Sequence, residues 1–98
     1  MLAPIDKLEV RLAESQPVQV FVDITSGLPG GCARFDHYTV NRASQTISIA
    51  VWNTMPAIDG PCTAIYGFVP HTIALGSGFP AGVYVVRAND VTTTFAVQ

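Results

Sequence analysis

A strict alternation along residues 18–25 is the feature that most restricts how this chain can fold. Val18, Val20, Val22 and Ile24 share one parity, and most of the residues between them are polar. Successive side chains of a β-strand point to opposite faces, so such a stretch has one face for a core and one for solvent. We therefore expect a half-buried strand here.

Other stretches alternate in the same way or are rich in aromatic and β-branched residues. They cover residues 7–12, 33–40, 47–52, 62–69, 72–75, 84–88 and 91–97. Phe35, Tyr38 and Val40 do not share parity, so we expect a β-bulge within 33–40. Pro70 is expected to end the strand over 62–69.

Turn-forming residues separate these stretches. We expect a polar loop at 41–45, the longest irregular loop at 53–61, and a two-residue hairpin turn at Asn89-Asp90. No long stretch has the apolar period of a helix. The prediction is an all-β fold, an immunoglobulin-like two-sheet antiparallel sandwich of about seven strands, with a small barrel as the alternative. The 98 residues leave room for one core, so residues 1–98 are expected to form a single β-sandwich domain.

Charge and hydropathy exclude some classes of partner. The net charge is −2, from 7 acidic and 5 basic residues with no basic cluster, which argues against binding nucleic acid. No apolar run approaches the roughly 20 residues that span a bilayer. The first residues lack the features of a signal sequence, so an exported form is expected to have lost its signal from this chain.

Cys32 and Cys62 each adjoin a turn sequence, and we expect them to form a disulfide. Closing a loop of this size stabilises a fold by roughly 3 to 4 kcal/mol in the chain-entropy model. The alternative is two buried free thiols in a cytosolic protein. A disulfide would place the domain in the periplasm, on the cell surface or in the medium.

Residues with catalytic or metal-binding chemistry are few. His37, His71, the two cysteines and Met55 fit no ligand spacing, so no metal and no cofactor are expected. Ser77 lies between glycines but lacks the frame of a nucleophile elbow. We expect no catalytic residue and no enzyme, with a cysteine paired with a histidine as the less favoured alternative.

The parity of the strands also suggests surfaces for interaction. Outward apolar positions predict a candidate interaction surface of Phe21, Trp52, Val83 and Val85. The long loop supplies a second candidate, made of Asn53, Met55, Ile58 and Asp59. An uncovered edge strand or apolar sheet face further predicts a possible homodimer.

Three motifs carry a resemblance to a known domain. They are Leu28-Pro29-Gly30-Gly31-Cys32, Asp59-Gly60-Pro61-Cys62-Thr63, and residues 79–86 followed by Asn89 and the stretch 91–97. With them the whole chain resembles a disulfide-tied β-sandwich domain of bacterial secreted proteins and lipoproteins. Asn89-Asp90 replaces the usual Asn-Gly, and Pro70-His71 replaces an acidic pair, so no acidic role is carried over. The resemblance implies the fold, the disulfide and export, and no mechanism.

Together these features predict a non-catalytic extracytoplasmic module that binds an unknown protein or envelope component, or that spaces other domains. A loop-based protein inhibitor is the first alternative. A small metal-binding protein or an enzyme is the second.

Overall fold

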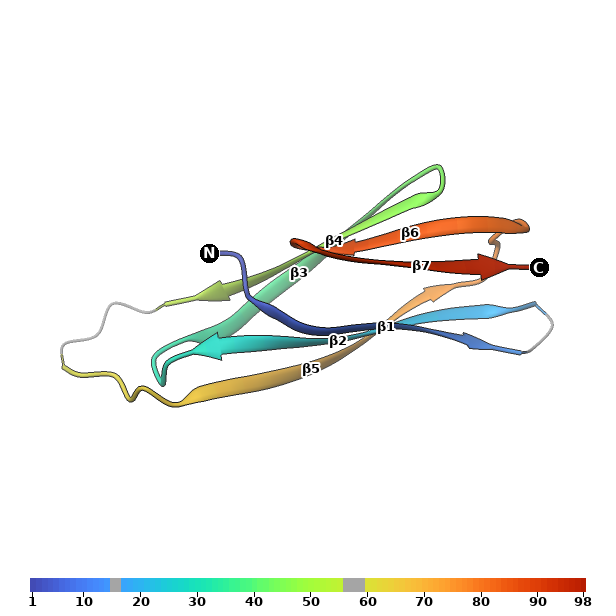
Figure 1. Cartoon of the computed structure of the whole chain (residues 1–98). Coiled ribbons are helices and arrows are strands. Elements are labelled where there is room, and N and C mark those ends of the chain that lie inside the picture. The colour runs from blue at the N-terminus through green and yellow to red at the C-terminus, as the bar shows by residue number, and fades with distance from the viewer. Residues whose placement is uncertain (15–16, 56–59) are drawn as a thin grey trace.

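The computed structural model of the chain describes residues 1–14, 17–55 and 60–98 (Figure 1). Within these ranges the chain forms seven strands and no helix, and hence no helix long and apolar enough to cross a membrane. The strands are β1 (Ile5–Ala13), β2 (Gln19–Pro29), β3 (Arg34–Ala43), β4 (Thr46–Thr54), β5 (Tyr66–Gly76), β6 (Gly82–Ala88) and β7 (Val91–Val97).

The strands form two sheets that pack face to face in an elongated sandwich of 53 × 22 × 17 Å. One sheet has the order β1-β2-β5, and the other has the order β3-β4-β6-β7. This confirms the predicted β-sandwich. One pairing departs from a purely antiparallel arrangement, because β4 and β6 run parallel. The chain crosses to the other sheet as β5 between them, so β6 returns in the direction of β4.

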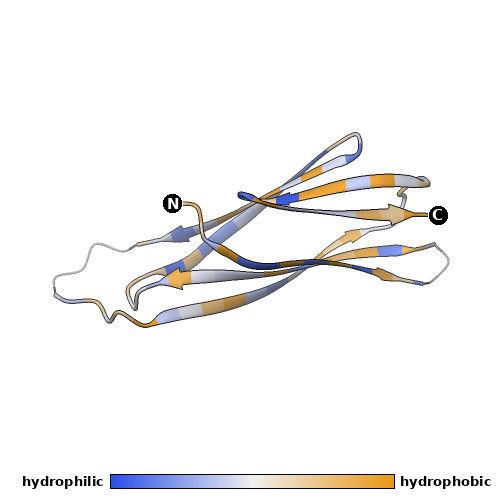
Figure 2. Cartoon of the chain, viewed as in Figure 1, coloured by the Kyte–Doolittle hydropathy of each residue, from blue (hydrophilic) through white to orange (hydrophobic). Residues whose placement is uncertain are grey.

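The core lies between the sheets and is built from one parity of each strand. Figure 2 shows hydrophobic residues on strands of both sheets. Burial of these apolar side chains supplies the main driving force for folding. The buried apolar cluster consists of Ala3, Val20, Val22, Ile24, Ile47, Ile49, Val51, Ile73, Tyr84, Val86, Ala88 and Phe95.

The bulge expected in β3 is present. The register of β3 against β4 shifts between Phe35 and His37, so Asp36 is the extra residue. Phe35 pairs with Asn53, whereas beyond the bulge Tyr38 pairs with Val51, and both partners are buried. The extra residue therefore brings Phe35 and Tyr38 to the inner face although they differ in parity.

Several predicted boundaries are wrong: β4 extends to Thr54, into the loop predicted at 53–61, and the strand predicted from residue 62 begins at Tyr66. Pro70 does not end a strand, because β5 runs through it to Gly76. Pro70 pairs with Thr25 of β2, at a position where its missing N–H would point to the free edge and not into the ladder. The predicted loop at 41–45 shrinks to the two residues between β3 and β4, where Ser44 adopts a positive φ of 57°.

The N-terminal segment belongs to both sheets. Leu2 forms a bridge to Trp52 of β4, and the Ala3 N–H donates to the Val51 carbonyl (2.9 Å). The Pro4 carbonyl then accepts a hydrogen bond from the Gly27 N–H of β2 (2.8 Å). The segment therefore continues the four-stranded sheet before β1 joins the other one.

Asn89 closes the junction between that segment, β4 and the turn from β6 to β7. It has a φ of 53°, as the predicted two-residue turn requires of its first position. Its side-chain Oδ1 accepts from the Val51 N–H (3.0 Å), and its Nδ2 donates to the carbonyls of Ala3 (2.6 Å) and Val51 (3.1 Å). The Asn89 side-chain amide thus makes the hydrogen bonds to β4 that the backbone of a neighbouring strand would otherwise make.

Candidate functional site

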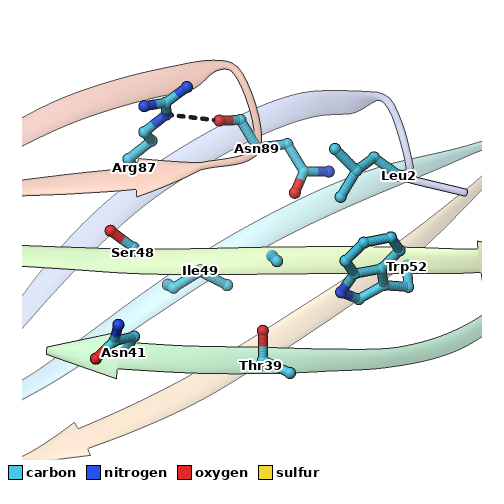
Figure 3. Close-up of a pocket in the computed structure, with 9 residues that line it drawn as sticks. Leu2, Thr39, Asn41, Ser48, Ile49, Trp52, Arg87 and Asn89 are labelled. Carbon is cyan, nitrogen blue, oxygen red and sulfur yellow. Dashed lines mark hydrogen bonds between the residues drawn. The ribbon is translucent and has the colours of Figure 1, made fainter.

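The candidate site is a hollow of about 370 Å³ on the outer face of the four-stranded sheet. It lies where β6 turns away from β4 and the N-terminal segment takes its place, which leaves a gap in the row of side chains. Figure 3 shows Trp52 and Arg87 toward opposite ends of the hollow, with Thr39 and Asn41 along its β3 side. The lining residues are Leu2, Thr39, Asn41, Ser48, Ile49, Ala50, Trp52, Arg87 and Asn89.

Strand register determines which side chains reach the hollow. Thr39 pairs with Ala50, and Asn41 pairs with Ser48, and all four lie on the outer face because the opposite parity of β4 is buried in the core. Directly paired residues of antiparallel strands are close neighbours on the same face. The hollow therefore has a short residue, Ala50, beside three small polar side chains.

Trp52 forms the wall at one end. Its ring stacks with the ring of His37, with centroids 5.9 Å apart and planes 11° from parallel. The His37 Nδ1 lies 3.1 Å from the Asp36 carboxylate. Leu2, in the N-terminal segment that bridges to Trp52, lies on the far side of the indole from β3 (Figure 3).

Arg87 is held at the other end by a hydrogen bond from its Nε to the Asn89 carbonyl (2.8 Å). In contrast, the side chains of Thr39, Asn41 and Ser48 have no protein hydrogen-bond partner within the described part of the chain. Hydroxyl and amide groups can each donate and accept hydrogen bonds. An aromatic ring, neutral polar groups and one cation are therefore available to a bound molecule.

The predicted interaction surface is divided by the structure. Trp52, Val83 and Val85 lie on the outer face of the four-stranded sheet, but Phe21 lies on the outer face of the other sheet, where the Arg11 guanidinium sits 5.3 Å from its ring centroid. Val83 is 62% exposed. Val85 pairs with Thr46, at the opposite end of β4 from Trp52. The alternation along a strand predicts that a side chain points outward, but it does not tell to which of the two sheets the strand belongs.

The predicted loop is also changed. Asn53 belongs to β4 and is only 2% exposed, and its Nδ2 donates to the Gly27 carbonyl of the facing sheet (2.8 Å). Its Oδ1 is buried without a partner among the described residues. Met55 is exposed. Ile58 and Asp59 lie outside the described residues.

Cys32 and Cys62 form the predicted disulfide, with Cα atoms 5.4 Å apart. Cys32 is buried at the turn between β2 and β3, whereas Cys62 is exposed. The Gly31 N–H donates to the Thr63 carbonyl (2.8 Å), which adds a backbone bond beside the disulfide. The segment before β5 is thus tied to the end of the sandwich.

The two histidines are separated by the four-stranded sheet. His71 faces the interior, where its Nε2 lies 3.0 Å from the Ser26 hydroxyl and its ring centroid lies 4.6 Å from that of Phe35. Burial lowers the pKa of His71, because the charged imidazolium would lose water. His37 faces outward. Within residues 1–14, 17–55 and 60–98, no three His, Cys, Asp or Glu side chains gather to hold a metal.

Sequence reasoning found Trp52 but missed the rest of the hollow. The parity of 47–52 gives the outward positions of Ser48 and Ala50. The contribution of Thr39 and Asn41 depends on the register of β3 with β4 beyond the bulge, and the sequence predicted the bulge but not that register. The Ser26–His71 contact joins residues 45 positions apart and was also missed.

A family model described as the ORF11 beta-sandwich domain matches residues 22–97. No curated protein gives a significant match to the chain, and neither does any solved structure. The matched region runs from within β2 to the end of β7 and includes β3, β4 and β6, which form most of the hollow. The chain belongs to the ORF11 beta-sandwich domain family.

Proposed function

We propose that this domain is a non-catalytic binding module of an exported protein and that it binds a sugar ring of an envelope component in the hollow beside Trp52. The observation that carries the proposal is the grouping of an aromatic wall with polar side chains that have no hydrogen-bond partner among the described residues. One face of a sugar ring is covered with C–H groups, while its rim carries hydroxyls. The C–H face would contact the indole, and the hydroxyls would bond Thr39, Asn41 and Ser48.

The positive charge of Arg87 indicates which sugars the hollow should bind. The Asn89 carbonyl occupies its Nε and leaves the terminal nitrogens of the guanidinium available for an anionic or hydroxyl group. No carboxylate is among the described residues that line the hollow. Neutral and acidic sugars are therefore expected to bind better than amino sugars with a free cationic amine.

The disulfide supports a location outside the cytoplasm, because such bonds persist mainly in oxidising compartments. The resemblance to domains of secreted proteins and lipoproteins agrees with this location. We propose the periplasm, the cell surface or the medium as the place of action.

Fluorescence of the single tryptophan tests the ligand directly, because Trp52 is the only one in the chain. The chain is titrated with neutral, uronic-acid and amino-sugar oligosaccharides. Binding should change the emission. Thr39→Val should raise the dissociation constant of the oligosaccharide by about two- to tenfold, because one hydrogen bond is lost. Thr94→Val, on the same outer face of β7 but away from the hollow, should leave it unchanged.

Unchanged emission with the whole panel would overturn the sugar ligand. Equal weakening by both threonine variants would instead refute the hollow as its site.

A thiol-labelling experiment tests the location independently. Cys32→Ser frees Cys62, which is exposed, for reaction with a membrane-impermeant maleimide in cells of the natural host. The variant should be labelled in unlysed cells whose outer envelope layer has been permeabilised. The wild-type chain should stay unlabelled under the same conditions. Labelling only after lysis would overturn the proposed export.

A further inference from the structure

We propose that two copies of this chain pair through the free edge of β3, in antiparallel orientation about a two-fold axis at Val40. The pairing would join the two four-stranded sheets into one continuous sheet. It goes beyond the binding of a ligand and concerns a different surface, the edge of the sheet and the groove beneath it.

Each sheet has two edge strands, and three of the four are protected. β1 carries exposed Lys7, Glu9 and Arg11, and charged side chains discourage pairing with another strand. β5 has Pro70 in its middle. β7 comes within 8 Å of β1, measured between Cα atoms, which closes that long side of the sandwich. Between its bulge and its turn, β3 has no proline, carries one charged side chain, Arg42, and has no strand of the described part of the chain paired along its outer edge.

Backbone hydrogen bonds show which groups of β3 are free. The Val85 N–H donates to the Gln45 carbonyl, and the Asn89 N–H donates to the Ile49 carbonyl. The backbone N–H and C=O groups of the odd-numbered residues along β4 therefore point toward β6. The backbone groups of the even-numbered residues of β4 point toward β3, where Ala50 pairs with Thr39 and Ser48 pairs with Asn41.

It follows that the N–H and C=O groups of Tyr38, Val40 and Arg42 point to the free edge. They offer a strand of hydrogen-bonding positions to a partner.

The side chains of the same residues lie over an open groove. Tyr38 and Val40 point toward the interior, yet they are 42% and 41% exposed because the facing sheet covers them only in part. A groove of about 350 Å³ runs between β3 and β5 and includes Ile73, Leu75 and Phe79 among its lining. A strand added to β3 would cover this groove with its inward side chains.

The extent of regular structure in β3 selects the register. The strand is regular from His37, after the bulge, to Ala43, before the turn at Ser44. Val40 is the centre of that stretch, so an axis at Val40 pairs all of it, with His37 opposite Ala43 of the second copy. Any other axis would shorten the pairing or include the bulge.

Charge and shape agree with this register. Tyr38 would lie opposite Arg42 of the second copy on the same face, where a guanidinium and an aromatic ring attract each other. Arg42 already makes such a contact, 3.9 Å from the Phe79 ring centroid, and the described residues that line the groove include no carboxylate. No like charges would be opposed. On the outer face Thr39 would lie opposite Asn41 of the second copy, so the two hollows would adjoin.

Proline at Val40 gives a selective test, because the lost N–H serves only the free edge and the β3–β4 ladder stays intact. The molar mass of the wild-type chain is measured by light scattering over a concentration series and should rise from 10.4 kDa toward twice that value. Val40→Pro should raise the dissociation constant by about ten- to a hundredfold, since symmetry removes two hydrogen bonds and inserts two rings.

Thr94→Pro is the matched control, because Thr94 holds the equivalent free-edge position on β7. It should leave the dimer unchanged, and circular dichroism should show both variants folded. Amide hydrogen exchange adds a readout that does not depend on variants: Tyr38, Val40 and Arg42 should gain protection as concentration rises.

A chain that stays at 10.4 kDa at every concentration would overturn the proposal and leave the edge to an extended strand of another protein. A dimer in which those three amides stay unprotected would also overturn it.

Discussion

Replacing Asn89 with glycine should destabilise the fold far more than the same replacement at the neighbouring Asp90. Both residues form the turn between β6 and β7, but only the Asn89 side chain bonds across the junction, with three hydrogen bonds to Ala3 and Val51. Glycine tolerates a positive φ, so the substitution removes the amide group without distorting the turn.

The size of the effect follows from those bonds. Three hydrogen bonds at about 0.5 to 1.5 kcal/mol each give a loss of about 1.5 to 4.5 kcal/mol. Relief of the positive φ returns about 1 kcal/mol. The net loss of about 0.5 to 3.5 kcal/mol compares with the roughly 5 to 15 kcal/mol that stabilises an ordinary domain.

Urea denaturation measures the effect. With an m-value of roughly 1 kcal/mol per molar urea, the midpoint of Asn89→Gly should fall by about 0.5 to 3.5 M. Asp90→Gly should change the free energy of unfolding by less than about 0.5 kcal/mol, as exposed substitutions usually do. Equal midpoints for the two variants would refute the role assigned to the Asn89 amide.

Two further predictions concern stability. Replacing both Cys32 and Cys62 with alanine should lower the free energy of unfolding by about 3.5 kcal/mol, the chain-entropy value for a separation of 30 residues, and an unchanged urea midpoint would contradict this. The folded-state pKa of His71 is lowered by burial, so above pH 6.5 the residue is neutral in both states and carries no penalty. As the pH falls below 6.5, the unfolded chain takes up the proton first, and stability is lost down to the folded-state pKa. Urea midpoints between pH 7 and pH 5 should therefore fall less steeply for His71→Gln than for the wild-type chain, and equal slopes would show that His71 is not the group responsible.

The sequence was sufficient for features that depend on local patterning. Alternation along the strands gave the β-class, the approximate number of strands and the half-buried character of β2. Mismatched parity in β3 indicated the bulge, because only an extra residue brings Phe35 and Tyr38 to one face. The tendency of Asn to adopt a positive φ located the last hairpin turn.

Features that depend on the environment of a residue were harder to predict. Proline breaks a strand inside a sheet, but Pro70 faces an edge, and strand order alone decides which strands are edges. Asn53 adjoins proline-rich sequence and resembles a loop residue, yet its amide donates across the core to Gly27.

Local sequence therefore determined which parity is buried in the strands that alternate regularly, such as β2 and β4, since one face of such a strand must leave water. Tertiary structure alone decided which sheet each strand joins, and with it the division of Phe21 from Trp52 and the meeting of Thr39, Asn41, Ser48 and Arg87 around one hollow. The physical reason is that backbone hydrogen bonds are nearly identical for every pair of strands. The choice among pairings rests on the packing of the whole core, which no single stretch of sequence contains.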